Sequence, residues 1–235
     1  MSPFLGEFTG TMLLIIMGDG VVANVVLNKT KGNNSGWIVI TFGWAMAVFL
    51  GVYVSTSLGG SGHLNPAVTI AMAAFSDFDS SLLPTYILAQ FAGAITGAII
   101  VWLAYKQHFD STEDKDGKLA VFCTAPAIRG PLYNLITEII GTFVLGFGAL
   151  AMSKPATTLG TLDALPVGLL VLGIGLSLGG PTGYAINPAR DLGPRIAHFI
   201  LPIKNKRDSD WGYSWIPVVG PIIGALLAVY LFKLI

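Results

Sequence analysis

Charged residues are scarce in this chain, and their scarcity is the first guide to its class. Only 11% of the 235 residues are Asp, Glu, Lys or Arg, against about 25% in soluble domains. The formal net charge is zero, so nothing in the composition suggests a nucleic-acid partner. Hydrophobic residues make up 53% of the chain, and the mean hydropathy is +0.71. The chain is therefore predicted to be a membrane protein that contacts the lipid bilayer.

Cysteine is almost absent as well. Cys123 stands alone, which excludes an internal disulfide, and the three histidines are scattered at positions 63, 108 and 198. No cluster of Cys and His has metal-ligand spacing, so neither a metal nor another cofactor is expected. The first apolar stretch lacks both a cationic leader and a small-residue cleavage site followed by a soluble domain. It is predicted to be a retained membrane helix rather than a signal peptide.

Long apolar runs are what the chain has instead. A helix of about 20 apolar residues crosses a bilayer, and six such spans are predicted, at 4–27, 37–57, 83–105, 132–152, 165–178 (the core of a longer span) and 215–234. Two further apolar segments, 66–75 and 188–200, are too short to cross. The charged stretch 107–118 is expected to be a water-facing loop. The predicted fold is an all-α membrane protein of six transmembrane helices and two half-helices.

Each short apolar segment opens with the same tripeptide. The copies are Asn65-Pro66-Ala67 and Asn187-Pro188-Ala189, and each follows a Gly-rich run. Proline suits the first turn of a helix, and Asn suits the cap before it. A helix that begins at membrane depth points free N–H groups and a partial positive charge into the interior, where protein or a water-filled path must receive them. The two Asn amides can donate hydrogen bonds to a passing oxygen atom.

The two halves of the chain match beyond these motifs. Residues 7–11 resemble 138–142, and residues 93–98 resemble 220–225, at offsets close to that between the two motifs. One domain, 1–235, is therefore predicted to contain two repeats, about 1–118 and 119–235, each with three spans and a half-span. An odd number of spans inserts the second repeat upside down, so the half-helices meet near the bilayer midplane.

The duplicated motif, followed in its second copy by Arg190 and Asp191, resembles the aquaporin family. Asp191 resembles the glycerol-conducting branch of that family, the aquaglyceroporins. The resemblance covers essentially the whole chain. It implies a homotetramer with one pore per protomer, a multi-pass location in the plasma membrane, and both termini in the cytoplasm. The count of Lys and Arg in the loops favours the opposite orientation.

The resemblance also implies a selectivity filter, formed by Trp44, Gly175, Tyr184 and Arg190. An arginine at membrane depth is costly and therefore functional by default. Water-selective members usually have histidine at the position of Gly175, so glycine there implies a wider opening. Trp44 implies an apolar wall for the carbon backbone of a solute. Two departures bear on this set. Tyr184 stands where glycerol facilitators usually have Phe. The loop before Asn65 has one residue more than the usual family pattern, so the assignment of Trp44 to the filter depends on placing the alignment gap within 55–60.

Backbone groups and buried acids complete the implied pore. The resemblance makes an acceptor ladder of the carbonyls of Ser61, Gly62, His63, Gly183, Tyr184 and Ala185. The alternative is that these glycines serve only to make tight turns. Glu7 and Glu138 are matched intramembrane acids, implied to anchor the two loops, with a proton relay as the alternative. Asp19 lies about 12 residues, or roughly 18 Å of helix, beyond Glu7, and is expected in water near the outer vestibule.

The function expected from these features is passive conduction of small uncharged solutes: glycerol and similar polyols, water, and undissociated lactic acid. Neither motif core contains a titratable group, and no enzymatic activity is expected. Two other classes stay open at this point. One is a proton-coupled secondary transporter of a small solute that uses Glu7 or Glu138. The other is a structural or adhesive membrane protein without solute flux.

Overall fold

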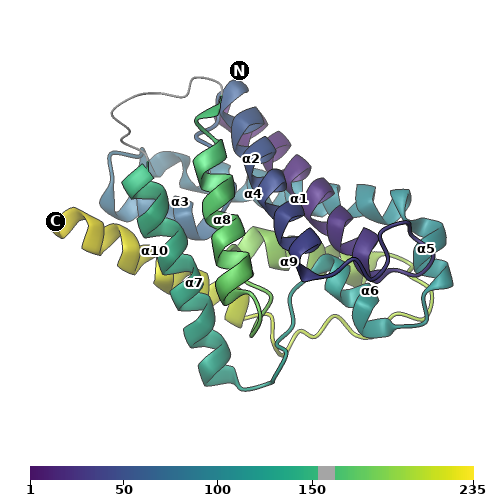
Figure 1. The fold of residues 1–235 in the computed structure, drawn as a ribbon. Helices are drawn as coiled ribbons and strands as arrows, with labels where there is room; N and C mark the ends of the chain where they lie inside the picture. Colours follow the sequence, from purple (N-terminus) through teal and green to yellow (C-terminus); the bar gives the residue numbers. More distant parts are fainter. Residues whose placement is uncertain (153–161) are drawn as a thin grey trace.

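The computed structural model describes residues 1–152 and 162–235, which form helices and loops and, within these ranges, no strand (Figure 1). The helices are α1 (Pro3–Val26), α2 (Trp37–Ser57), α3 (Pro66–Phe75), α4 (Leu83–Ala104), α5 (Lys106–Ser111), α6 (Lys115–Phe122), α7 (Pro131–Met152), α8 (Leu165–Leu178), α9 (Pro188–Ile200) and α10 (Ile216–Leu234), with a 3-10 turn at Ser80–Leu82. The predicted spans and half-spans agree with these bounds to within one residue, which confirms the all-helical prediction.

Five of the described helices are long and apolar enough to cross a membrane: α1, α2, α4 with its preceding 3-10 turn, α7 and α10. Helix α8, the core of the predicted fifth span, is apolar but has only 14 residues. Helices α3 and α9 are shorter than a bilayer, with 10 and 13 residues, and begin at the two Asn-Pro-Ala motifs. They are the predicted half-helices.

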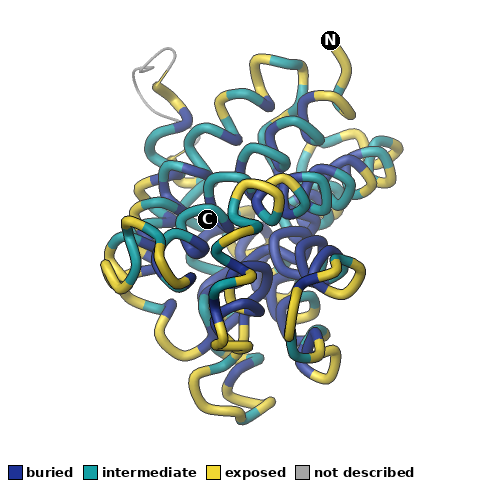
Figure 2. Tube along the Cα trace, turned by 90° about the vertical axis from the view of Figure 1, so that its right-hand side faces the viewer, coloured by how far each residue is buried: buried dark blue, intermediate teal, exposed yellow. Residues whose placement is uncertain are grey.

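The two halves of the chain make matching helix contacts. Helix α1 packs against α2 and α4, and α7 packs in the same way against α8 and α10. Each half-helix also contacts the other half of the chain, α3 on α10 and α9 on α4. These exchanged contacts bring both half-helices into the interior. Figure 2 shows buried residues gathered through the centre of the molecule, with exposed positions along its periphery and loops.

Small residues allow the long helices to approach closely. A Cβ atom added at Gly97 of α4 would lie 2.6 Å from the carbonyl oxygen of Met12 in α1. A Cβ atom at Gly224 of α10 would lie 2.4 Å from the carbonyl oxygen of Ile139 in α7. Side chains cannot fit at such distances, so the prediction of close Gly-xxx-Gly packing is confirmed at matched places in both halves.

The stretch 107–118 is largely helical rather than the loop that its charges predict, although Gln107, Asp110 and residues 113–116 are exposed as expected. It contains most of α5 and the first half of α6, and α6 packs against α1 and α9. Asp114 caps α6 by accepting a hydrogen bond from the N–H of Asp116 at 3.0 Å. Lys118 is 1% exposed and donates to the carbonyl of Lys204 at 2.7 Å; burial lowers the pKa of its ammonium group. Apolar side chains such as Phe109 and Phe122 draw the segment onto the bundle.

Candidate conduction pore

The pore is organised by the caps of α3 and α9. The Asn65 side-chain oxygen accepts a hydrogen bond from the N–H of Ala67 at 3.0 Å. The Asn187 oxygen accepts from the N–H groups of Ala189 at 3.0 Å and Arg190 at 3.2 Å. Each Asn therefore presents its oxygen to its own helix, which leaves its NH₂ group turned away from that helix.

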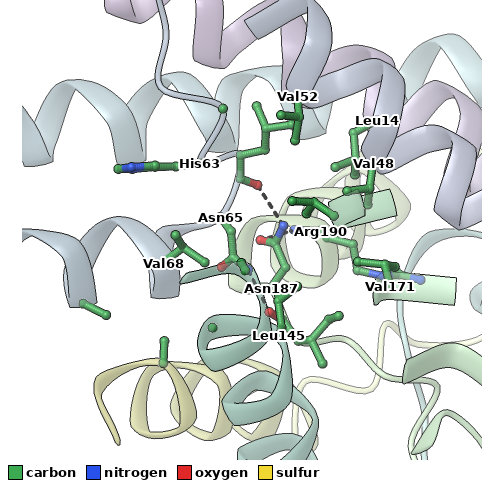
Figure 3. A pocket seen from close by; sticks show the side chains of 18 of the residues that line it. Leu14, Val48, Val52, His63, Asn65, Val68, Leu145, Val171, Asn187 and Arg190 are labelled. Carbon is green, nitrogen blue, oxygen red and sulfur yellow. Dashed lines mark hydrogen bonds between the residues drawn. The ribbon is translucent and has the colours of Figure 1, made fainter. Parts of the chain in front are cut away.

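The two motifs are joined to each other by these NH₂ groups. The amide nitrogen of Asn65 donates to the carbonyl of Ile186 at 2.8 Å, and that of Asn187 donates to the carbonyl of Leu64 at 2.8 Å. Figure 3 shows the two Asn side chains next to each other at the centre of the cavity. Each NH₂ carries two hydrogens and uses one in this exchange. The second hydrogen on each side is left for a solute oxygen.

Leu64 and Ile186, the two acceptors, were not among the predicted site residues. Both lie in the left-handed region of backbone space, with φ of +51° and +45°. Large aliphatic residues seldom adopt this conformation, and strain of this kind accumulates at functional sites. The left-handed turn orients each carbonyl toward the Asn of the opposite motif. A signal was present, since both residues fill the same place between a Gly-rich run and Asn.

Buried carboxylates hold both loops in this conformation. Glu7 accepts hydrogen bonds from the N–H groups of His63 at 3.0 Å and Leu64 at 2.7 Å. Glu138 accepts from the N–H groups of Ala185 at 3.0 Å and Ile186 at 2.8 Å. Both acids are at most 1% exposed. Each carboxylate supplies acceptors to strained loop amides that lipid could not satisfy.

We expect Glu138→Gln to destabilise the loop before α9. Gln places an NH₂ where one carboxylate oxygen now accepts, so donors face donors, at a cost of about 1–3 kcal/mol. Thermal unfolding in detergent should occur at lower temperature, with loss of solute flux. Glu113→Gln, at an exposed acid in the segment before α6, is the control and should unfold like the wild type. Equal unfolding temperatures for the two variants would show that Glu138 does not support the loop.

A cavity of about 300 Å³ runs along the Asn pair. One part of its wall is polar and contains both Asn side chains, Arg190 and backbone of the loops before the motifs. Most of the rest of the wall is apolar and includes Val48 and Val52, both labelled in Figure 3. Of the predicted ladder, Ser61, Gly62, His63, Tyr184 and Ala185 line the cavity. Gly183, Gly175 and the Pro-Ala residues of both motifs are not among its described lining residues.

Three predicted filter residues line this cavity. The guanidinium carbon of Arg190 lies 4.0 Å from the centroid of the Trp44 ring, in a cation–π contact. Tyr184 joins them in the lining. Gly175 lies behind Tyr184, since a Cβ atom placed there would be 2.9 Å from the phenol Cζ. Trp37, which donates to the Gly175 carbonyl at 3.0 Å, packs edge-on against Tyr184.

A buried ion pair fixes the start of α9 behind the filter. Asp191 pairs with Arg195 at 2.8 Å, and both side chains are fully buried. The second carboxylate oxygen of Asp191 accepts two hydrogen bonds from Thr124, each at 2.7 Å. At the other end of α9, the Lys206 ammonium donates to the carbonyls of Phe199 and Leu201, both at 2.8 Å. A cation there complements the helix dipole, and partial burial lowers the pKa of this ammonium.

Asp19 is not in water near the outer vestibule, as its distance from Glu7 suggested. It is 0% exposed, in a helix that packs against α2, α4 and α6. Its distance along the helix from Glu7 carries no information about the helices that pack against α1.

Two capped half-helices that meet inside a helical bundle, beside a largely apolar cavity with a few polar groups, define a polytopic membrane channel. The family model described as "Major intrinsic protein" matches residues 1–232, and the chain belongs to that family. It is a channel protein rather than an enzyme.

Relatives and a solved structure agree with this assignment. A "Probable glycerol uptake facilitator protein" of Thermotoga maritima is 60% identical over 233 residues, 99% of each chain. A "D/L-lactic acid transporter" of Lactiplantibacillus plantarum is 41% identical over 234 residues, 98% of this chain and 96% of the relative. The aquaglyceroporin of Plasmodium falciparum superposes with a TM-score of 0.86 at 31% identity, covering 99% of this chain and 98% of that one.

Proposed function

We propose that this chain is a passive channel for glycerol and other small neutral solutes, water included. The observation that carries the proposal is the cross-bonded pair Asn65 and Asn187, whose spare amide hydrogens border the cavity. Two fixed donors at one level can hold successive hydroxyl groups of a polyol. The name of the Thermotoga maritima relative supports glycerol as a permeant.

The cavity wall supports a solute with one polar and one apolar side. A polyol passing the Asn pair would turn its hydroxyls toward the amides and its carbon backbone toward Val48 and Val52. At the filter the corresponding surfaces are the Arg190 guanidinium and the Trp44 ring. The matching of both surfaces replaces hydration lost by the solute, which keeps the entry barrier low.

The same geometry opposes cations and protons. The N-termini of α3 and α9 carry partial positive charge, and they converge at the Asn pair. Positive half-helix ends at a constriction exclude cations in pores of this kind. Arg190 adds a full positive charge among the lining residues.

Proton-coupled transport is the less favoured mechanism. Both oxygens of Glu7 and both oxygens of Glu138 accept hydrogen bonds from loop N–H groups or neighbouring side chains. Protonating either acid would remove an acceptor from a strained loop. A relay role is therefore in conflict with the support that each carboxylate gives to the loop.

The proposal extends to assembly and location. The matched helix contacts of the two halves support inverted repeats, 1–118 and 119–235. We place the channel in the plasma membrane as a homotetramer with cytoplasmic termini, as the family resemblance implies. The outer surface of the bundle bears large apolar side chains such as Leu132 and Tyr133, 63% and 75% exposed. Such a surface suits lipid or neighbouring protomers.

Flux measurements in proteoliposomes test the proposal. Vesicles containing the protein should re-swell in a glycerol gradient much faster than empty vesicles. Net glycerol entry should stop when the concentrations inside and outside the vesicles are equal. An imposed proton gradient should not drive it further, because a channel only equilibrates. Accumulation above equilibrium would establish the transporter instead, and glycerol entry no faster than in empty vesicles would refute the proposed function.

A further inference from the structure

A second cavity lies on the outside of the bundle, apart from the pore. Its floor is α1 and its walls are α2 and α4, which both pack against α1. Met17 and Gly20 of α1, Met46 of α2 and Ile100 of α4 are among its lining residues, and none of these four is buried. Within the described part of the chain, this α1 groove shares no lining residue with the pore cavity. It is therefore a separate feature of the membrane-facing surface.

The α1 groove has the dimensions of a single extended chain. Its floor is open at Gly20, where an added Cβ atom would meet nothing within 4 Å. Its α1 residues run from Ile16 to Asn24, which is about 12 Å along the helix axis, close to the roughly 15 Å that one leaflet adds to the hydrocarbon core. A volume of about 440 Å³ over that length gives a mean cross-section of about 37 Å², whereas a helix about 10 Å wide needs about 80 Å². A whole helix does not fit into the groove.

The polar side chains of the α1 groove lie at one end. Asn24 and Tyr105 are the only polar side chains among its described lining residues. Asn24 lies in the last turn of α1, and Tyr105 is the C-cap residue of α4. The rest of the lining is apolar, and Met17 and Met46 contribute flexible side chains that adapt to an irregular occupant. This arrangement fits an acyl chain whose ester region lies at the polar end.

Lysine side chains lie next to this polar end. The loop that carries Lys31 folds back on the end of α1, since the residues on both sides of Lys31 donate hydrogen bonds to Asn24. Lys29 lies in the same loop. Both lysines are exposed, and neither forms an ion pair among the described residues. Lys106, at the start of α5, is paired with Asp110. Uncompensated positive charge thus borders the polar end of the groove.

We propose that the α1 groove binds an anionic phospholipid of the leaflet at the C-terminal end of α1. One acyl chain lies over Gly20 between Met17 and Met46, and the phosphate lies at Lys31. Phosphate oxygens accept charge-assisted hydrogen bonds from ammonium groups, and basic residues next to a membrane span attract anionic headgroups. A neighbouring copy of the chain is a less suitable occupant, because the groove is too narrow for a helix. The site does not depend on which solute the pore conducts.

Native mass spectrometry of the purified protein tests the site, because one spectrum reports both the oligomer and its bound lipids. The probe is phosphatidylglycerol, compared with phosphatidylcholine of the same acyl chains. The wild type should bind phosphatidylglycerol more tightly than phosphatidylcholine. Gly20→Leu fills the open floor and should weaken phosphatidylglycerol binding about tenfold, the effect of displacing roughly two buried methylene groups. Gly173→Leu is the control, since a Cβ atom there also meets nothing within 4 Å and Gly173 lines neither cavity.

Lys31→Gln tests the headgroup contact separately from the acyl chain. It should weaken phosphatidylglycerol binding about fivefold, the effect of one lysine near anionic headgroups. Phosphatidylcholine binding should stay unchanged, because that headgroup carries no net charge. Lys233→Gln removes another exposed lysine, near the end of α10, and should bind phosphatidylglycerol like the wild type.

The possible outcomes separate the parts of this proposal. Equal phosphatidylglycerol affinity of Gly20→Leu and Gly173→Leu would overturn the acyl-chain site, and equal binding of the two lipids by the wild type would overturn the anionic headgroup. A changed oligomer mass in Gly20→Leu, with lipid binding unchanged, would assign the groove to a neighbouring copy. If Gly20→Leu does not assemble, Gly20→Ala decides: it should weaken binding about threefold, the effect of one methyl group, and unchanged binding would overturn the site.

Discussion

Gly175→Ala should lower glycerol flux by about tenfold, with a smaller effect on water, although Gly175 does not line the cavity. A Cβ atom at 175 would lie 2.9 Å from the Tyr184 Cζ and 2.9 Å from the Thr41 Cγ2. Overpacking of this kind costs about 1–3 kcal/mol unless a neighbour moves. Tyr184 has cavity on its other side, so its ring should shift toward Trp44 and Arg190 and narrow the slot. Stopped-flow light scattering of proteoliposomes measures both fluxes.

Helix α8 offers a matched control for this substitution. Gly173 lies two residues away, and a Cβ atom there would meet nothing within 4 Å. Gly173→Ala changes helix propensity equally and should leave glycerol flux unchanged. In the double variant Gly175→Ala with Tyr184→Ala, the obstructing ring is gone and glycerol flux should rise again. Similar glycerol flux in the two single variants would mean that Tyr184 does not border the conduction path.

The sequence predicted the helices well because their signals are local or repeated. Each local signal determines one feature of a helix. The apolar runs indicate which segments are helical, the Pro after each Asn indicates where a half-helix begins, and the Gly-xxx-Gly pairs indicate where helices pack closely. The duplicated motif then supplied long-range information that a single sequence usually lacks. It predicted that Asn65 and Asn187 lie at the same depth in the membrane.

The contacts that shape the filter could not be predicted in the same way. The position of Gly175 behind Tyr184 depends on side-chain packing between α8 and the loop before α9. The burial of Asp19 depends on the helices that pack against α1, and one of them, α6, has a charged sequence that resembles a loop although Phe122 is buried. Leu64 and Ile186 contribute through carbonyl direction, and side-chain identity carries little information about that. In each case the decisive contact joins distant segments and leaves no periodic pattern.

Weak acids such as lactic acid should pass this channel only in their undissociated form. Arg190 is the only Lys or Arg among the described residues that line the cavity, and Arg195 is held by Asp191. A carboxylate would give up strong hydration in a largely apolar cavity, and one arginine offsets only part of that loss. The name of the Lactiplantibacillus plantarum relative makes lactic acid a relevant solute to test.

The pH dependence of flux distinguishes the neutral acid from its anion. Above the pKa of the acid, each unit of falling pH raises the neutral form about tenfold. Lactic acid flux through reconstituted protein, corrected for empty vesicles, should rise in that proportion, because the concentration of the permeant species rises. Glycerol flux in the same vesicles should stay nearly flat, which controls for effects of pH on the protein itself. A valinomycin-set potassium potential should not change the acid flux, since a neutral solute carries no current. Flux that follows the anion concentration, or responds to the potential, would show that the filter admits carboxylates.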